Sequence, residues 1–117
     1  MSKCPTFQAA GILGKKWTIV LMQEIALNEG GGSNSIFKRI KKISPKILSR
    51  RLKELEELDI IKKDVINNKI SIRTKYRLTE KGKELYGITT NIKAWSIKYS
   101  KEKLNCDDLT CVECHLY

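Results

Sequence analysis

One segment of the chain, residues 44–58, most constrains the fold because it carries a complete set of helix signals. Ser44 is a preferred N-cap residue, and Pro45 follows at the first helical position, where its missing N–H costs no hydrogen bond. Leucines then recur at helical spacing on one side of the segment: Leu48, Leu52 and Leu55. We therefore predict a helix from Ser44 to about Leu58 that buries one apolar stripe and exposes its other side.

The hydrophobic period changes directly after this helix. Residues 60–66 and 71–78 are rich in β-branched side chains, and Asn67-Asn68-Lys69 between them is a turn signal, so we predict a two-stranded hairpin. Other helices are predicted over residues 6–13, over 17–28 with one apolar stripe, over 35–42 with Ser33 or Asn34 as cap, and from a cap at Thr79 onwards. This order is that of a winged helix-turn-helix, a mainly α fold with a β-hairpin wing (α+β).

Positive charge is concentrated on two of these predicted elements. The 117 residues include 23 Lys or Arg against 13 Asp or Glu, which gives a net charge of +10. Residues 38–53 hold eight of the basic residues and no acidic one, and residues 60–78 hold six with Asp64 as the sole acid. A solvated surface would explain any one of these lysines. The unbroken run beside a capped amphipathic helix instead favours a polyanion, and we expect double-stranded DNA.

In this arrangement the helix after Ser44 would enter the major groove, and the hairpin would reach the minor groove or the backbone. Base-edge contacts are predicted for the outward side of the helix, from Lys46, Ser49, Arg50 and Lys53. Contacts to phosphate or to the minor groove are predicted for Lys41, Lys42, Arg51, Lys69, Arg73 and Lys75. Ser44 is expected mainly to build the helix start, and we count it among the DNA-binding residues as well. The alternative interpretation of the same charge is a sequence-independent nucleic-acid-binding protein that coats a chromosome or binds RNA.

Several other classes of protein are disfavoured by what the sequence lacks. No apolar run is long enough to span a bilayer and the first residues do not form a secretory signal, so we expect a cytoplasmic protein with no membrane partner. The single histidine is His115, and the sequence contains no nucleotide-binding glycine loop. We therefore do not expect an enzyme.

Several motifs taken together resemble one family of regulators. They are Cys4-Pro5, Gly14-Lys15-Lys16-Trp17, Ile43-Ser44-Pro45-Lys46-Ile47-Leu48, Leu52-Lys53-Glu54-Leu55, Tyr76-Arg77-Leu78-Thr79-Glu80-Lys81-Gly82 and Trp95. Over residues 4–95 the chain resembles the HxlR-type branch of the MarR-like winged helix-turn-helix transcriptional regulators. It departs from the family pattern ahead of the recognition helix, where Gly32-Ser33-Asn34-Ser35-Ile36 stands in place of the usual Arg-Phe-x-Glu-Leu.

This resemblance implies a homodimer that forms through the N-terminal and C-terminal helices and binds a roughly palindromic operator. The implied interface contains one residue of the first helix and the apolar stripe of the last: Phe7, Leu85, Ile88, Ile92, Trp95 and Tyr99. In some members of the family the cysteine of the Cys-Pro pair senses oxidants or electrophiles, so the resemblance makes Cys4 a candidate redox residue. The alternative is an unreactive thiol packed at the dimer interface.

The chain divides by charge and cysteine content near residue 101. Residues 1–101 form the predicted DNA-binding and dimerisation domain, and residues 102–117 form an acidic, cysteine-rich tail. The tail contains candidate metal ligands at spacings found in zinc and iron–sulfur sites: Cys106, Cys111, Cys114 and His115. Three interpretations stay open, namely a zinc or iron–sulfur site completed by Cys4, a zinc site completed by His115, or disulfides that tie the tail down.

Overall fold

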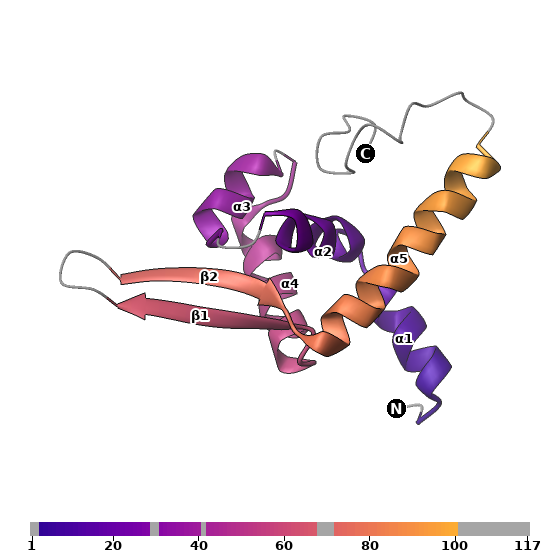
Figure 1. The fold of residues 1–117 in the computed structure, drawn as a ribbon, viewed down its shortest axis with the longest axis horizontal. Helices are drawn as coiled ribbons and strands as arrows, with labels where there is room; N and C mark the ends of the chain where they lie inside the picture. Colours follow the sequence, from indigo (N-terminus) through magenta and orange to yellow (C-terminus); the bar gives the residue numbers. More distant parts are fainter. Residues whose placement is uncertain (1–2, 29–30, 41, 68–71, 101–117) are drawn as a thin grey trace.

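The chain folds as a winged helix-turn-helix, as predicted (Figure 1). The computed structural model describes residues 3–28, 31–40, 42–67 and 72–100. The helices among these residues are α1 (Pro5–Leu13), α2 (Thr18–Leu27), α3 (Ser33–Arg39), α4 (Pro45–Glu57) and α5 (Glu80–Lys98). Between α4 and α5, strands β1 (Ile61–Asn67) and β2 (Ile72–Leu78) pair antiparallel in a hairpin. None of the helices in the described ranges is long and apolar enough to cross a membrane.

The start of α4 is built as predicted. Ser44 has an extended backbone, and its Oγ accepts a hydrogen bond from the Ile47 N–H at 3.2 Å. Pro45 lies in the first turn, where it needs no hydrogen-bond partner for its nitrogen. The leucine stripe is buried along its whole length, at Leu48, Leu52 and Leu55. Because the stripe faces the core, the polar side of α4 faces solvent.

Helix α2 forms the centre of the core. It packs against α1, α5 and β2, so it is covered on several sides. Leu21, Met22 and Ile25 are buried, and so are the polar side chains of Gln23 and Glu24. The expected single apolar stripe is therefore too narrow a description of this helix. Its burial is set by neighbours from later parts of the chain, which the local pattern does not contain.

Helix α3 begins earlier and is shorter than the predicted range of 35–42. It spans Ser33–Arg39 with Gly32 at the N-cap, and neither Ser33 nor Asn34 caps it. Gly32 lies so close to β2 that a Cβ would be 2.5 Å from the Thr74 carbonyl oxygen. The close approach of this glycine to the hairpin decides where α3 begins.

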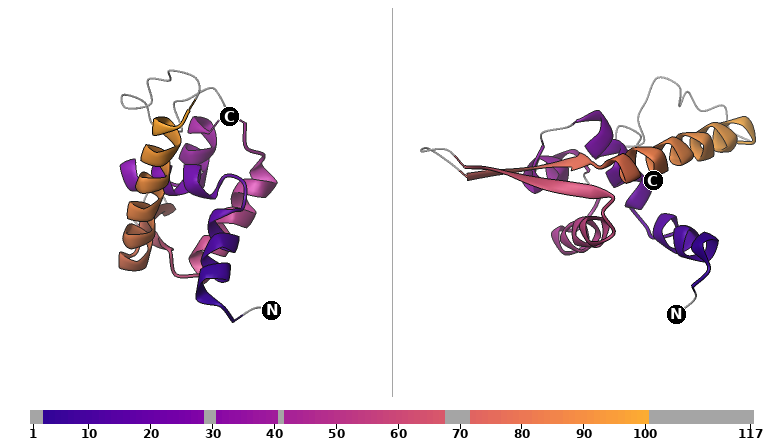
Figure 2. Two further views of the ribbon diagram at one scale, coloured as in Figure 1. Left: turned by 90° about the vertical axis from the view of Figure 1, so that its right-hand side faces the viewer. Right: turned by 60° about the horizontal axis from the view of Figure 1, so that its bottom comes forward.

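The hairpin is fastened to the helices at its base. Thr79 caps α5 as predicted, since its Oγ1 accepts a hydrogen bond from the Gly82 N–H at 3.0 Å. The same Oγ1 donates to the Asp59 carbonyl oxygen at 2.6 Å, and the Thr79 N–H donates to the Ile60 carbonyl oxygen at 3.0 Å. A Cβ on Gly82 would overlap that Ile60 oxygen, so only glycine fits here. From this junction the hairpin and α5 extend in opposite directions (Figure 2).

Candidate nucleic-acid interface

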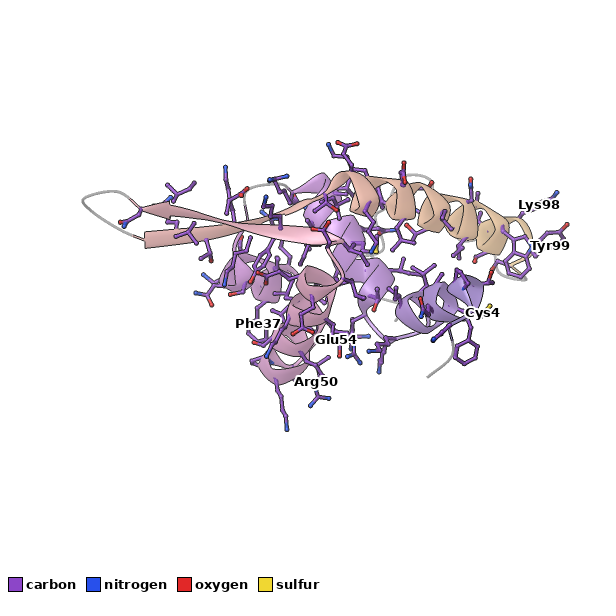
Figure 3. The ribbon with its side chains drawn as sticks, turned by 90° about the horizontal axis from the view of Figure 1, so that it is seen from below. Cys4, Phe37, Arg50, Glu54, Lys98 and Tyr99 are labelled. Carbon is purple, nitrogen blue, oxygen red and sulfur yellow. The ribbon has the colours of Figure 1, made fainter. Side chains whose placement is uncertain are left out.

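The exposed side of α4 carries a row of polar and basic side chains. Lys46, Ser49, Arg50 and Lys53 are all exposed, opposite the buried leucines. Arg50 points away from the body of the molecule (Figure 3). Within the described part of the chain, none of the three cations of this row has an acidic partner. The row is therefore available to an external anion.

The hairpin adds positive charge beside α4, against which β1 packs. Arg73 is exposed and Lys75 is half-buried, and both line a hollow of about 490 Å³ between β2 and the start of α3. A third basic residue of β2, Arg77, is paired instead, because its Nε donates to Oδ2 of Asp64 at 2.9 Å. We call the cations of the α4 row, together with those of the hollow, the basic surface: Lys46, Arg50, Lys53, Arg73 and Lys75.

One arginine of the basic run is used inside the protein. Arg39 Nη1 lies 2.6 Å from Oε1 of Glu24, whose side chain is only 2% exposed. Asn28 Nδ2 donates to the other carboxylate oxygen at 3.2 Å. The pair ties the end of α3 to the central helix and compensates the buried carboxylate. This ion pair was not predicted from the sequence. Glu24 lies between the apolar Met22 and Ile25, however, and an acidic residue on a buried helix indicates that a cation is close to it.

Arg51 also has internal partners, although we predicted a phosphate contact for it. Its Nε donates to the Lys16 carbonyl oxygen at 3.0 Å, and its Nη1 lies 3.1 Å from Oε2 of Glu54. Its side chain is 15% exposed, so it lies on a flank of α4 and not on its outward side. The predicted DNA contact of Arg51 stays a prediction, and its internal partners make a structural role the better supported one.

The family follows from comparison with known proteins. Residues 12–104 match the sequence profile of the family described as HxlR-like helix-turn-helix. The chain belongs to this HxlR-like family. YvaP of Bacillus subtilis, an uncharacterised HTH-type transcriptional regulator, is 36% identical over 97 residues, which cover 82% of this chain and 88% of YvaP. The HTH-type transcriptional regulator YodB of the same organism is 31% identical over 97 residues, 82% of this chain and 85% of YodB.

Two solved structures have the same architecture. The reduced form of YodB superimposes with a TM-score of 0.71 over 86% of this chain and 97% of that one. The reduced form of the redox regulator HypR is 24% identical and superimposes with a TM-score of 0.73 over 81% of this chain and 92% of HypR. The HxlR-like chain is thus a DNA-binding helix-turn-helix transcriptional regulator with a winged fold.

This HxlR-like regulator has a second exposed surface, which is apolar. Along α5, Ile88 is 53% exposed, Trp95 66% and Tyr99 64%, and on α1 Phe7 is 67% exposed. The rings of Trp95 and Tyr99 contact each other, with centroids 5.7 Å apart. Leu85, also predicted for the dimer interface, is half-buried against the core. We call the exposed set the apolar patch: Phe7, Ile88, Ile92, Trp95 and Tyr99.

The remaining candidate residues of the HxlR-like chain fall into two groups. Cys4 is exposed at the N-cap of α1, and Lys42 is exposed ahead of α4. The others lie outside the described residues: Lys41, Lys69, Cys106, Cys111, Cys114 and His115. Among the described residues, no three His, Cys, Asp or Glu side chains gather as metal ligands would. The described part of the regulator therefore presents a basic surface, an apolar patch and one exposed thiol.

Proposed function

We propose that this regulator is a homodimer that binds a specific operator, with α4 of each protomer in the major groove and the hairpin on the adjacent minor groove or backbone. Bases would be read from the outward row of α4, by Lys46, Ser49, Arg50 and Lys53. Phosphates or the minor groove would be contacted by Lys41, Lys42, Lys69, Arg73 and Lys75. Ser44 fixes the start of α4, so that the first free N–H groups of the helix would also face the phosphate backbone of the DNA.

The observation that carries the proposal is the row of cations on α4. Arg39 and Arg77 are held by acidic side chains, whereas Lys46, Arg50 and Lys53 have no acidic partner among the described residues. The buried leucine stripe turns all three outward. An arginine in such a row can bind O6 and N7 of guanine with two hydrogen bonds, which gives base preference as well as affinity.

Homodimerisation is supported by the apolar patch. Monomeric soluble proteins rarely expose large contiguous apolar areas, and here Ile88, Trp95 and Tyr99 of α5 are each more than half exposed, with Phe7 as a further exposed ring on α1. A second copy would cover the patch with the same patch, as two-fold symmetry requires. The two α4 helices would then read half-sites about 34 Å apart, one turn of DNA.

We further propose that Cys4 makes operator binding sensitive to electrophiles. The relative YodB has been solved in reduced and in quinone-bound forms. Cys4 is exposed at the start of α1, the helix that also carries Phe7 of the apolar patch. A quinone would form a bond from a ring carbon to Sγ of Cys4 while the thiol proton passes to one ring oxygen. The hydrogen of that ring carbon then moves to the other ring oxygen, which restores the aromatic ring and leaves a thioether-linked hydroquinone. We expect the protein to act in the cytoplasm.

The test is a titration with a DNA duplex that the wild-type protein enriches from a random-sequence library. Arg50→Ala should weaken binding to this duplex by about 1–3 kcal/mol and relax base preference at one position of each half-site. Lys83→Ala removes an exposed lysine from α5 and should leave both quantities close to wild type. Unchanged affinity of Arg50→Ala would contradict the reading role of α4.

Two further results separate the parts of this proposal. If the library yields no preferred sequence and affinity falls steeply with salt on every duplex, the protein is a sequence-independent nucleic-acid binder. If treatment with a quinone leaves operator affinity of the wild type unchanged, or changes that of Cys4→Ser equally, Cys4 is not the sensing residue.

A further inference from the structure

The turn between α1 and α2, residues 14–17, is closed by its own contacts. The Thr18 N–H donates to the Lys15 carbonyl oxygen at 3.2 Å. Trp17 has a φ of 78°, in the left-handed region that favours glycine, and Lys16 Nζ lies 5.4 Å from the centre of the Trp17 ring. The turn joins α1 directly to α2, so a contact to the turn is also a contact to the ends of these two helices.

Two side chains of α4 bind this turn. Arg51 Nε donates to the Lys16 carbonyl oxygen at 3.0 Å. Glu54 Oε2 lies 3.3 Å from Lys15 Nζ and 3.1 Å from Arg51 Nη1, so one carboxylate joins the turn to the helix and orients the arginine. The side chains of Arg51 and Glu54 are 15% and 28% exposed. This partial burial makes the Arg51–Glu54 contact stronger than a fully solvated ion pair, whereas the side chain of Lys15 is 50% exposed.

These contacts connect two surfaces that otherwise belong to different parts of the fold. Helix α4 packs mainly against α3 and β1, whereas the apolar patch lies on α1 and α5, the helices that pack on α2. Figure 3 shows Glu54 on α4, with α1 and its Cys4 on one side of that helix. The turn after α1 is thus a direct tie between the helices of the patch and the reading helix.

We propose that Arg51 and Glu54 are positioning residues that set the angle of the reading helix relative to the dimer and thereby fix the half-site spacing that the regulator accepts. This inference rests on the proposed function, since it presupposes two α4 helices in one dimer. Half-sites on DNA recur at a fixed distance, so a small rotation of each α4 changes which separation fits. A reading helix held only by its apolar stripe would tolerate several separations.

Simple electrostatics predicts the opposite result for Glu54. An acidic residue on a DNA-binding helix repels phosphate, so its neutralisation alone should tighten binding to every duplex. If the carboxylate positions α4, Glu54→Gln should weaken binding to the operator, although the protein gains positive charge. Arg51→Lys keeps the charge and loses the bond to the Lys16 carbonyl oxygen, so electrostatics predicts no change where positioning predicts a loss.

The experiment measures the affinity of the full chain for the duplex enriched by the wild type and for two altered duplexes, with one base pair inserted or removed between the half-sites. We expect the wild type to bind the altered duplexes about tenfold or more weakly. Glu54→Gln and Arg51→Lys should bind the original duplex about five- to tenfold more weakly than the wild type does and discriminate between spacings by less than about threefold. Glu57→Gln, which neutralises an exposed acid on the same helix, should keep the wild-type discrimination.

Thermal unfolding and sedimentation of each variant are measured alongside. Variants that remain folded dimers but lose spacing discrimination support the proposal. Tighter binding by Glu54→Gln with unchanged discrimination overturns it and leaves the proposed function standing, and so does loss of folding in both variants, since the residues would then only stabilise the fold. A wild type that enriches no sequence overturns both, and is recognised before any variant is made.

Discussion

The basic surface and the apolar patch are both exposed, but their exposure has opposite physical consequences. Cations such as Arg50 are well solvated in the free protein, so the isolated chain pays nothing to expose them. Exposure of apolar side chains such as Trp95, which is 66% exposed, raises the free energy of the isolated chain in water. One surface is stable alone and attracts a partner over long range, whereas the other needs a partner at contact.

The two surfaces would have separate roles in the proposed regulator. Attraction between the basic surface and phosphate depends on salt, because binding releases counterions from DNA. Burial of the apolar patch is insensitive to moderate salt and depends on shape and contact. The two surfaces can therefore be disrupted separately, by a substitution in one of them or by a change of salt.

Trp95→Asp should have the largest effect, because it places a carboxylate in the apolar patch of both protomers. Burial of an unpaired charge costs several kcal/mol per ion, so self-association should weaken by more than about 10⁴-fold. Sedimentation over a concentration series measures this. Operator affinity should fall with it, because two linked half-sites become two separate ones.

Thr90→Asp is the matched control. It adds the same charge to an exposed position of α5 that lies about 140° round the helix from Trp95. This variant should remain a dimer. A dimer that survives Trp95→Asp, or that is lost equally in Thr90→Asp, would place the interface elsewhere.

Salt should separate the two surfaces without any substitution. Between about 50 and 200 mM salt, we expect operator affinity to fall by about a hundred- to a thousandfold, as for a protein that neutralises several phosphates. Self-association through the apolar patch should change by less than about threefold over the same range. Parallel fluorescence titrations and sedimentation measure the two constants. Equal dependence on salt would mean that charged contacts also hold the dimer.

Glu24→Gln tests whether Arg39 belongs to the structure and not to the basic surface. The substitution removes the charge from a buried carboxylate that Arg39 and Asn28 both contact, and it should lower the free energy of unfolding by about 1–3 kcal/mol. Asp64→Asn breaks the more exposed pair with Arg77 and should cost less than about 1 kcal/mol. Chemical denaturation measures both. Similar costs would show that burial of Glu24 does not strengthen its ion pair.

The smallest effect is expected at Tyr76, which lies in the core beneath the basic surface. Burial, helped by the negative charge of Glu56, raises the pKa of the Tyr76 phenol above its ordinary value of 10.0. Below that pH both the folded and the unfolded state keep the proton, so the contribution of the phenol to stability is fully present. As pH rises further the unfolded state loses the proton first, and the contribution is lost as pH passes through the folded pKa.

The free energy of unfolding should therefore decrease less between about pH 9 and pH 11 in the Tyr76→Phe variant than in the wild type. Denaturation curves at several alkaline pH values check this, with Tyr86→Phe as the control for loss of a hydroxyl group. A decline as steep as that of the wild type would exclude the Tyr76 phenol as a cause of the alkaline loss.

Features with a local cause were predictable from the sequence. The caps at Ser44 and Thr79, the leucine stripe of α4 and the hairpin each depend on residues a few positions apart, and each is confirmed. The family resemblance was also readable, since its motifs are short and continuous. The helix-turn-helix with its wing followed from these elements in order.

Features with a distant cause were not predictable. The start of α3 depends on contact between Gly32 and Thr74, and the internal role of Arg39 depends on Glu24. The same holds for Arg51, whose partner Lys16 lies 35 positions away. For the two arginines, the run of basic residues looked uniform in the sequence, and only the fold separates cations with an internal partner from cations that face outward.

The contacts at the base of the hairpin limit which parts of the hairpin can change during evolution. Thr79 hydrogen-bonds to the carbonyl oxygens of Asp59 and Ile60, and Gly82 packs against Ile60. These contacts join the two strands at the base of the hairpin and cover the core there.

Val65, towards the outer end of the hairpin, is 60% exposed and adds little to that core. Val65 pairs with Thr74, which lies against Gly32 at the start of α3, so only the hairpin beyond this pair can lengthen, shorten or be exchanged between relatives without a cost to the helices. The length of DNA that the proposed dimer covers can then evolve while its reading helix and its pairing are left intact.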